Sequence, residues 1–239
     1  GSTIKMSNAL AALESGVMDP AETVTCNGYV EISGRRFHCW KSGGHGRVDM
    51  VGALRQSCDV YFYEVAQRIG IDGIFAMNDR LGLGQKYDLP LSGMVHGNNP
   101  SRAWKQERYG QDWLIGDTIN ASIGQGFTLT SPIQLATMTA RLASGTAVLP
   151  RLVRPLGGAG PGEPVPASLG LSAEALAIVR QGMFEVSNHE RGTAYASRIA
   201  DVNKAMAGKT GSSQVFSITA AERAAGVRSQ DELPWNRRD

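Results

Sequence analysis

Hydrophobic residues recur at helical spacing in several segments of the chain, with polar and glycine-rich stretches between them. Ile4, Leu10 and Leu13 share one helical face, which predicts a helix over 2–15 that Gly16 ends. The same criterion predicts a helix over 60–69. Further helices are expected over 49–56, 72–81, 131–144, where Pro132 lies in the first turn, and 171–186, which Ser172 introduces. Short β-rich runs predict strands over 23–24, 29–32, 148–153 and 213–216.

Residues 20–48 differ from the helical segments around them. Short strand-like pieces alternate there with glycine-rich turns, so we expect a loop-rich insertion with a small core of its own. Such a segment often needs a disulfide bond or a bound metal ion to hold its conformation. Residues 84–113 are polar and are predicted to be a loop, as is the Gly/Pro-rich segment 157–166; the tail from Ala220 is charged and turn-rich.

Composition narrows the functional class only slightly. The 239 residues suffice for one large domain or two small ones, and an apolar content of 42% is ordinary for a soluble core. A net charge of +2 gives no case for nucleic acid as a partner. The sequence has no apolar run long enough to predict a membrane-spanning helix, and no signal peptide is visible in it.

The start of the chain pairs a hydroxyl with an amine. Ser2 and Lys5 are three residues apart on the predicted helix, so their side chains face the same way. A lysine acts as a base only where burial or a nearby cation lowers its pKa, and Lys209 is the candidate cation. Alone, such a pair is common by chance and also fits an exposed serine beside a solvated lysine.

A second polar string, Ser57-Cys58-Asp59, lies between two predicted helices. Its outer side chains, Ser57 and Asp59, can point into one cleft while Cys58 points away. The alternative is a simple helix break with Ser57 as the N-cap.

The third string, Lys209-Thr210-Gly211, reads as an edge strand that lines a groove. Lys209 and Thr210 would hold a carboxylate, and Gly211 would let a substrate backbone approach closely. The N–H groups of Ser212 and Ser2 would form an oxyanion hole. A turn with an exposed lysine is the alternative. The order and wide separation of the three strings indicate a serine acyltransferase with a lysine base.

These motifs resemble those of class B penicillin-binding proteins, and within that class the penicillin-binding protein 2 subfamily of rod-shaped bacteria. The likeness rests on Gly1-Ser2-Thr3-Ile4-Lys5, Ser57-Cys58-Asp59-Val60-Tyr61-Phe62-Tyr63, Lys209-Thr210-Gly211-Ser212, Gly116-Asp117-Thr118, Ser122-Ile123-Gly124-Gln125-Gly126 and Thr130-Ser131-Pro132-Ile133-Gln134-Leu135-Ala136. Asp59 stands where many relatives carry Asn. The resemblance implies an α+β, serine β-lactamase-like fold, an antiparallel sheet flanked by helices, spread over 1–239 and incomplete at both ends.

The resemblance also implies a mechanism. Ser2 would attack the D-Ala–D-Ala bond of a peptidoglycan stem peptide with Lys5 as base, and Ser57 would relay the proton to the leaving amine. An amine from a neighbouring stem peptide would then resolve the acyl-enzyme and form a cross-link. β-Lactams would acylate Ser2 to a stable adduct, and no cofactor is needed for this chemistry.

Three cysteines and a histidine are spaced as Cys26-x12-Cys39-x5-His45-x12-Cys58, which supplies four soft or borderline metal ligands. The resemblance implies a structural zinc here, because some members of the subfamily bind zinc at this place. His38 is an alternative ligand, whereas His96 and His189 read as ordinary surface or loop residues. A Cys26–Cys39 disulfide or three buried free thiols would also fit the sequence.

Rival functions stay open at this point. A D,D-carboxypeptidase or a serine β-lactamase uses similar motifs but passes the acyl group to water, and a β-lactam sensor or an inert fragment would not cross-link.

By family analogy we expect a periplasmic domain of a single-pass inner-membrane protein. A cell-wall glycosyltransferase and the elongation machinery are its expected partners.

Overall fold

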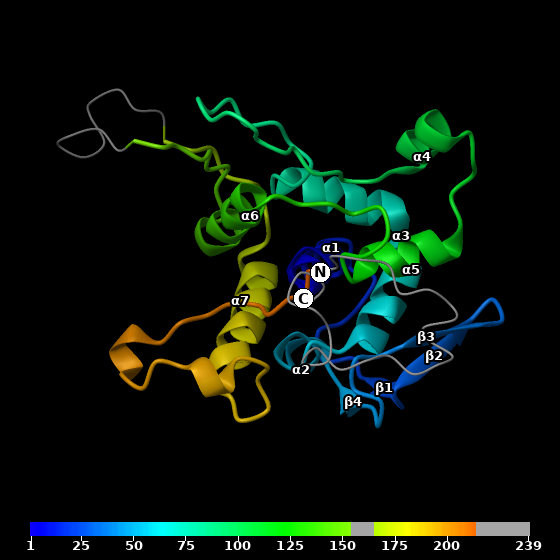
Figure 1. Cartoon of the computed structure of the whole chain (residues 1–239). Helices are drawn as coiled ribbons and strands as arrows, with labels where there is room; N and C mark the ends of the chain where they lie inside the picture. Colours follow the sequence, from blue (N-terminus) through cyan, green and yellow to red (C-terminus); the bar gives the residue numbers. More distant parts are fainter. Residues whose placement is uncertain (154–164, 214–239) are drawn as a thin grey trace, which may run out of the picture.

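Helices dominate the computed structural model, which describes residues 1–153 and 165–213 (Figure 1). They are α1 (Lys5–Glu14), α2 (Met50–Arg55), α3 (Asp59–Arg80), α4 (Arg102–Tyr109), α5 (Ile115–Ser122), α6 (Pro132–Ser144) and α7 (Ala173–Asn188), with one-turn 3-10 helices η1 (Ser2–Ile4), η2 (Tyr195–Ser197) and η3 (Val202–Lys204). The strands are β1 (Val24–Cys26), β2 (Tyr29–Ile32), β3 (Arg35–His38) and β4 (Gly46–Val48).

Helix α1 lies at the centre of the molecule, with α3 and α5 on one side and α7 on the other (Figure 1). Every residue from Lys5 to Ala12 is buried, the polar ones included. Leu10 is fully buried, and burial of a leucine side chain contributes about 1.5–3 kcal/mol to folding. A helix covered on all sides can hold a polar side chain away from water, and this sets the environment of Lys5.

The prediction of two helices separated at Gly70 is confirmed in outline. Helix α3 runs from Asp59 to Arg80 but is broken at Gly70, whose φ of 65° and ψ of 175° are not helical. This backbone conformation is essentially restricted to glycine. Helix α3 is therefore divided into two halves, and Asp59 of the second polar string begins the first of them.

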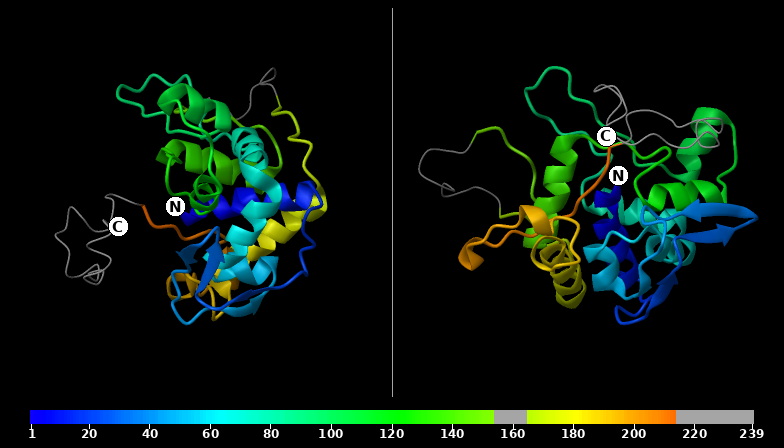
Figure 2. Two further views of the ribbon diagram at one scale, coloured as in Figure 1. Left: turned by 90° about the vertical axis from the view of Figure 1, so that its right-hand side faces the viewer. Right: turned by 60° about the horizontal axis from the view of Figure 1, so that its bottom comes forward.

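The four strands form two separate antiparallel pairs, β1 with β4 and β2 with β3. Cys26 pairs with Gly46 in the first, and Tyr29 pairs with His38 in the second. Both pairs pack against α3, on the opposite side of the molecule from α6 (Figures 1 and 2). The expected strands and glycine turns of 20–48 are therefore present.

Three expectations about local structure were wrong. Helix α4 lies inside the segment predicted to be a loop; its one buried residue is Lys105, so the helix has no apolar stripe to signal it. Residues 148–153 form no strand, since the nearby pairing is the single bridge Thr146–Ser168. Residues 209–211 form no strand, because no described strand pairs with them to complete a ladder. Residues 154–164 and 214–239 lie outside the described part, and with them most of the predicted loop over 157–166, nearly all of the strand over 213–216 and the charged tail.

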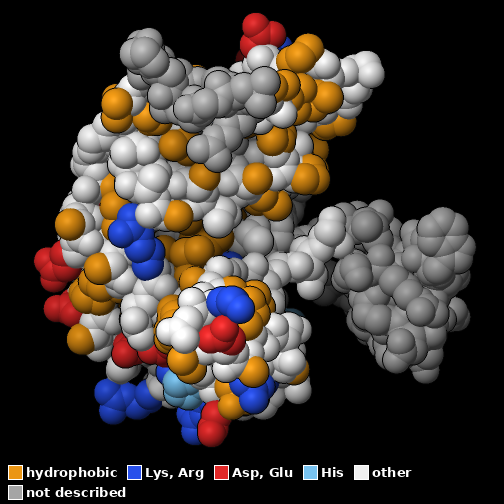
Figure 3. All heavy atoms as spheres, turned by 90° about the vertical axis from the view of Figure 1, so that its left-hand side faces the viewer, with side chains coloured by type: hydrophobic (Ala, Val, Ile, Leu, Met, Phe, Trp, Pro, Cys, Tyr) orange, Lys and Arg blue, Asp and Glu red, His pale blue; other side chains and the backbone are white. Residues whose placement is uncertain are grey.

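Acidic and basic side chains are interspersed on the face shown in Figure 3. Among the described residues, no helix has both the length and the apolar character needed to cross a bilayer.

Candidate active site and thiol cluster

The Lys5 ammonium group lies at the centre of a buried polar cluster. Its Nζ donates to the Asp59 carboxylate Oδ1 at 2.6 Å, to the Ser57 carbonyl at 2.9 Å and to the Ser57 hydroxyl at 3.3 Å. The lysine side chain is 0% exposed and that of Asp59 is 9% exposed. An ammonium group has three N–H donors, so each finds an acceptor without water. The predicted convergence of Lys5, Ser57 and Asp59 is therefore present in the structure.

Local backbone geometry separates the two faces of the Ser57-Cys58-Asp59 string. Helix α2 ends just before it, and Ser57 takes a left-handed conformation with φ of 54°, which is costly for a residue with a Cβ. The Cys58 N–H then returns to the Ala53 carbonyl at 2.9 Å, and α3 begins at Asp59. Ser57 and Asp59 consequently face Lys5 while Cys58 faces away, as the sequence predicted. Ser57 is not an N-cap, since Cys58 holds that position on α3.

The third string lies against the first. A Cβ placed on Gly211 would lie 3.4 Å from the Ser2 nitrogen and 3.3 Å from the Thr3 nitrogen. The pKa of Lys209 is lowered to about 7, mainly by burial and in smaller part by the positive charge of Lys5, against an opposing effect of Asp59. Lys209 is thus close enough to the Lys5–Asp59 pair for their charges to interact. Its own ammonium donates to the Thr210 carbonyl at 3.1 Å.

Ser2 occupies the first position of η1, one turn ahead of Lys5. A glycine turn closes over it: a Cβ on Gly124 would come within 2.3 Å of the Gly1 carbonyl oxygen, and Gly124 has a φ of 69°. Only glycine permits both the left-handed backbone and so close an approach. The predicted site residues Ser2, Lys5, Ser57, Asp59, Lys209, Thr210, Gly211 and Ser212 are thus brought together in one region around the start of α1.

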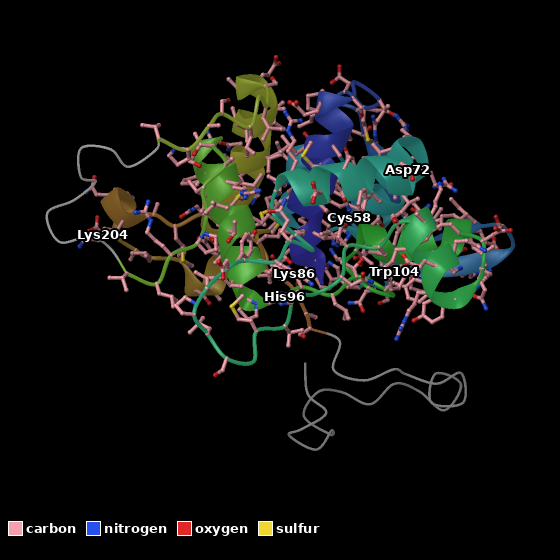
Figure 4. All side chains as sticks on the ribbon, turned by 90° about the horizontal axis from the view of Figure 1, so that it is seen from above. Cys58, Asp72, Lys86, His96, Trp104 and Lys204 are labelled. Carbon is pink, nitrogen blue, oxygen red and sulfur yellow. The ribbon has the colours of Figure 1, made fainter. Side chains whose placement is uncertain are left out.

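On the other face of Cys58, the predicted metal ligands also converge. One ligand atom from each of Cys26, Cys39, His45 and Cys58 lies within 4.8 Å of all the others. The Nδ1 atom of His45 is 3.6 Å from the Cys26 sulfur and 3.5 Å from the Cys39 sulfur. The three cysteines are free thiols, and His38 is not part of the group. Figure 4 shows Cys58 among the packed helices, whereas Lys204 lies at the periphery.

The two sulfur–nitrogen distances fit a tetrahedral metal ion. With metal–sulfur bonds of about 2.3 Å and metal–nitrogen bonds of about 2.0–2.1 Å, a tetrahedral site separates its sulfur and nitrogen ligands by about 3.5 Å. A hydrogen bond from Cys58 lowers the pKa of the Cys39 thiol to about 5 and raises that of Cys58. The buried Nε2 of His45 has no hydrogen-bond partner. The four candidate ligand side chains therefore interact mainly with one another.

Two further side chains lie near the site and were not predicted from the sequence. Asn8, one helical turn beyond Lys5, donates to the Ser122 carbonyl at 2.7 Å and so connects α1 to α5. Thr193 lies 2.6 Å, hydroxyl to hydroxyl, from Thr210 of the third string. The i, i+3 spacing of Lys5 and Asn8 could have revealed the first. No local pattern marks Thr193, which comes from the turn after α7.

Residues 1–227 match the family model described as the penicillin binding protein transpeptidase domain. The chain belongs to this family. Its predicted class, an α+β fold of the penicillin-binding transpeptidase type, is therefore confirmed. Here the sheet is represented by the two short strand pairs.

Known members of the transpeptidase family show how far the likeness extends. The peptidoglycan D,D-transpeptidase MrdA of Haemophilus influenzae is 35% identical over 239 residues, which cover 96% of this chain and 37% of that protein. MrdA of Escherichia coli K12 is 33% identical over 92% of this chain and 36% of its own length. This chain therefore spans little more than a third of the length of these relatives.

Solved structures of the family agree with the fold. A structure of Pseudomonas aeruginosa PBP2 superposes with a TM-score of 0.81 at 37% identity, covering 90% of this chain and 50% of that one. PBP2 of Helicobacter pylori, solved in a complex with MreC, gives a TM-score of 0.80 at 33% identity, covering 90% and 40%. The resemblance to the penicillin-binding protein 2 subfamily is confirmed.

Proposed function

We propose that the protein is a peptidoglycan D,D-transpeptidase of cell-wall elongation that works through an acyl-enzyme on Ser2. The observation that carries this proposal is the buried hydrogen-bonded group of Lys5, Ser57 and Asp59, one helical turn from Ser2 and next to the third string. Lys5 lies one helical turn from the Ser2 nucleophile and is hydrogen-bonded to the Ser57 hydroxyl, which suits it to pass a proton between these two serines in serine–lysine acyl transfer.

Each step of the reaction has a candidate group. In its deprotonated form, the Lys5 amine takes the proton of the Ser2 hydroxyl as the Ser2 oxygen attacks the carbonyl between the two D-Ala residues. The oxyanion is held by the N–H groups of Ser2 and Ser212. Ser57 passes the proton to the departing D-Ala amine, which completes the acyl-enzyme. Attack by an amine of a second stem peptide then breaks the ester to Ser2 and forms the cross-link.

The third string would bind the donor peptide. Lys209 and Thr210 are suited to hold its terminal carboxylate, and Gly211 leaves room for its backbone. The Thr193 hydroxyl supports this role, because its contact with Thr210 fixes the orientation of the threonine side chain.

Acylation by a fluorescent penicillin tests the proposal. We expect one label per molecule of the full-length protein, located on Ser2 by mass spectrometry and absent from the Ser2→Ala variant. Labelling that survives Ser2→Ala, or no labelling of the folded wild-type protein, would contradict it. The lifetime of the adduct distinguishes the rivals: hours support the transpeptidase, whereas seconds indicate a β-lactamase. Conversion of a pentapeptide donor to the tetrapeptide without cross-linking to an added acceptor indicates a D,D-carboxypeptidase. A sensor would acylate but form no cross-link.

We also propose that Cys26, Cys39, His45 and Cys58 hold a structural zinc ion. Three thiolates and one imidazole form a closed set with no open position for substrate, which is typical of structural sites. Bound there, the ion would tie segment 20–48 to the start of α3 and so to Ser57 and Asp59.

Elemental analysis of protein purified without chelators tests the metal. We expect about one zinc per chain in the wild-type protein. His45→Ala should lose it, whereas His38→Ala, which removes an exposed histidine from the same segment, should retain it. Absence of stoichiometric metal from the wild-type protein, or its retention in His45→Ala, would overturn this assignment.

The cellular setting follows from the relatives and is part of the proposal. A periplasmic location with a membrane anchor fits a peptidoglycan transpeptidase. The Helicobacter pylori PBP2 structure is a complex with MreC, and another similar structure, with a TM-score of 0.69 at 30% identity, is described as a peptidoglycan synthase complex that coordinates polymerization and crosslinking. A cell-wall glycosyltransferase and the elongation machinery are the partners we propose for this protein.

A further inference from the structure

Trp40 makes an unusual set of contacts for an exposed tryptophan. It is 61% exposed, so apolar burial does little to hold it in place. Its indole Nε1 donates to the carbonyls of Gln56 and Ser57, both at 3.1 Å, and its backbone N–H donates to Asp59 Oδ2 at 2.8 Å. Polar contacts with the second string therefore fix this side chain.

The carbonyl of Ser57 is the point where Trp40 and Lys5 meet. It accepts from Lys5 Nζ at 2.9 Å and from the Trp40 indole at 3.1 Å. Ser57 has a left-handed backbone, with φ of 54°, and such a conformation persists only where its surroundings enforce it. Two donors on one carbonyl provide that enforcement, and the direction of the Ser57 hydroxyl toward Lys5 depends on the same backbone.

The Asp59 carboxylate is shared in the same way. One oxygen accepts from Lys5 and the other from the Trp40 backbone N–H. The Trp40 ring also packs edge to face against the His45 ring, with their centroids 5.4 Å apart. In sequence, Trp40 directly follows Cys39. Trp40 thus contacts the Lys5 group and the thiol cluster at once.

We propose that Trp40 is a positioning residue for acyl transfer, whose indole N–H holds the Ser57 carbonyl and so directs the Ser57 hydroxyl at Lys5. This inference rests on the proposed function and deepens it. A ligand-stacking role for the exposed ring is the competing interpretation, and it predicts a different kinetic effect.

Trp40→Phe tests the proposal, because it retains an aromatic ring and the backbone N–H but removes the indole donor. Tyr29→Phe is the matched control, since it removes one polar group from another exposed aromatic residue of the same segment. For each full-length protein, the rate of β-lactam acylation is measured over a range of drug concentrations. Such data separate the dissociation constant of the initial complex, the first-order acylation constant and the fraction of active molecules.

We expect Trp40→Phe to lower the first-order acylation constant about tenfold, the scale of one lost hydrogen bond to a strained carbonyl, with the dissociation constant unchanged. Tyr29→Phe should leave both constants unchanged. Because the acylation constant is measured on the active molecules alone, partial misfolding of Trp40→Phe does not obscure the result.

An acylation constant of Trp40→Phe within about twofold of the wild type would overturn the proposal. A weaker initial complex with normal acylation would also overturn it and would indicate ligand stacking. So would a reduced active fraction whose remaining molecules acylate normally, which would indicate a merely structural role. Failure of the proposed function looks different, because the wild-type protein itself would then not acylate on Ser2.

Discussion

Two polar clusters lie back to back on a single tripeptide, and they differ in what completes them. On one face, the Lys5 ammonium satisfies its three donors with acceptors from Ser57 and Asp59. On the other, Cys58 joins Cys26, Cys39 and His45, whose donor atoms face one another. The first cluster balances its charges within the protein, whereas the second is a set of electron donors that a cation would balance.

This difference indicates a division of roles. Ser57 and Asp59 are held by hydrogen bonds whose partners come from α1 and from Trp40, so their geometry serves chemistry directly. Cys58 contacts the ligand residues of segment 20–48, a segment of short strands that contains no helix of its own. Perturbing the thiol side should therefore act mainly on stability, and perturbing the Lys5 side should act on both stability and acylation.

The largest expected effect is on the thiol side. Cys58→Ser should lower the free energy of unfolding by roughly 4 kcal/mol or more, because loss of a structural metal ligand belongs to the most destabilising class of substitution. The acylation constant of the molecules that remain folded should fall by less than about tenfold. Denaturant unfolding and penicillin titration measure the two quantities.

Chelation provides the companion measurement for the thiol side. A strong chelator should lower the melting temperature of the wild-type protein and leave that of Cys58→Ser unchanged. An equal response of the two proteins, or a Cys58→Ser variant as stable as the wild type, would show that the two clusters do not divide their roles in this way.

The next effect is on the Lys5 side. Asp59→Ala leaves a buried ammonium without its carboxylate and should destabilise the protein by roughly 3 kcal/mol, as well as slow acylation strongly. Asp117→Ala is the matched control, because Lys105 and Asp117 form another largely buried pair, with Nζ and Oδ2 2.6 Å apart and side chains 4% and 18% exposed. Denaturant unfolding and acylation rates test both variants. The control should lose comparable stability but retain acylation, and equal acylation losses would contradict a special role for Asp59.

The sequence sufficed to predict the members of both clusters, because each consists of chemically distinctive residues at characteristic spacing. The geometry is local for a serine and a lysine one helical turn apart, and for a cysteine between two polar residues that share the opposite face of the backbone. Trp40 does not: its contacts reach Gln56, Ser57 and Asp59, which are 16 to 19 positions away. Thr193 is missed for the same reason, since its partner Thr210 is 17 positions away.

Helices with a buried apolar stripe could be predicted from the sequence, whereas a helix without such a stripe could not. The helices α1, α3 and α7 follow such stripes, whereas α4 buries mainly the Lys105 side chain against Asp117. The predicted strand over 148–153 had β-forming residues but has no strand partner among the described residues. Strand formation depends on a neighbour that may be distant in sequence, and a single segment does not carry that information.

The smallest expected effect near neutral pH concerns Lys209, whose charge interacts with those of Lys5 and Asp59. Its pKa is lowered from 10.5 to about 7, mainly by burial, so between these pH values the unfolded chain binds more protons than the folded one. The wild-type protein should therefore gain stability relative to Lys209→Met as the pH rises from 7 towards 10.5, with no difference in slope below pH 7. Denaturant unfolding of both proteins across this range measures the gain. Parallel pH profiles would mean that Lys209 titrates normally and stands apart from the Lys5–Asp59 pair.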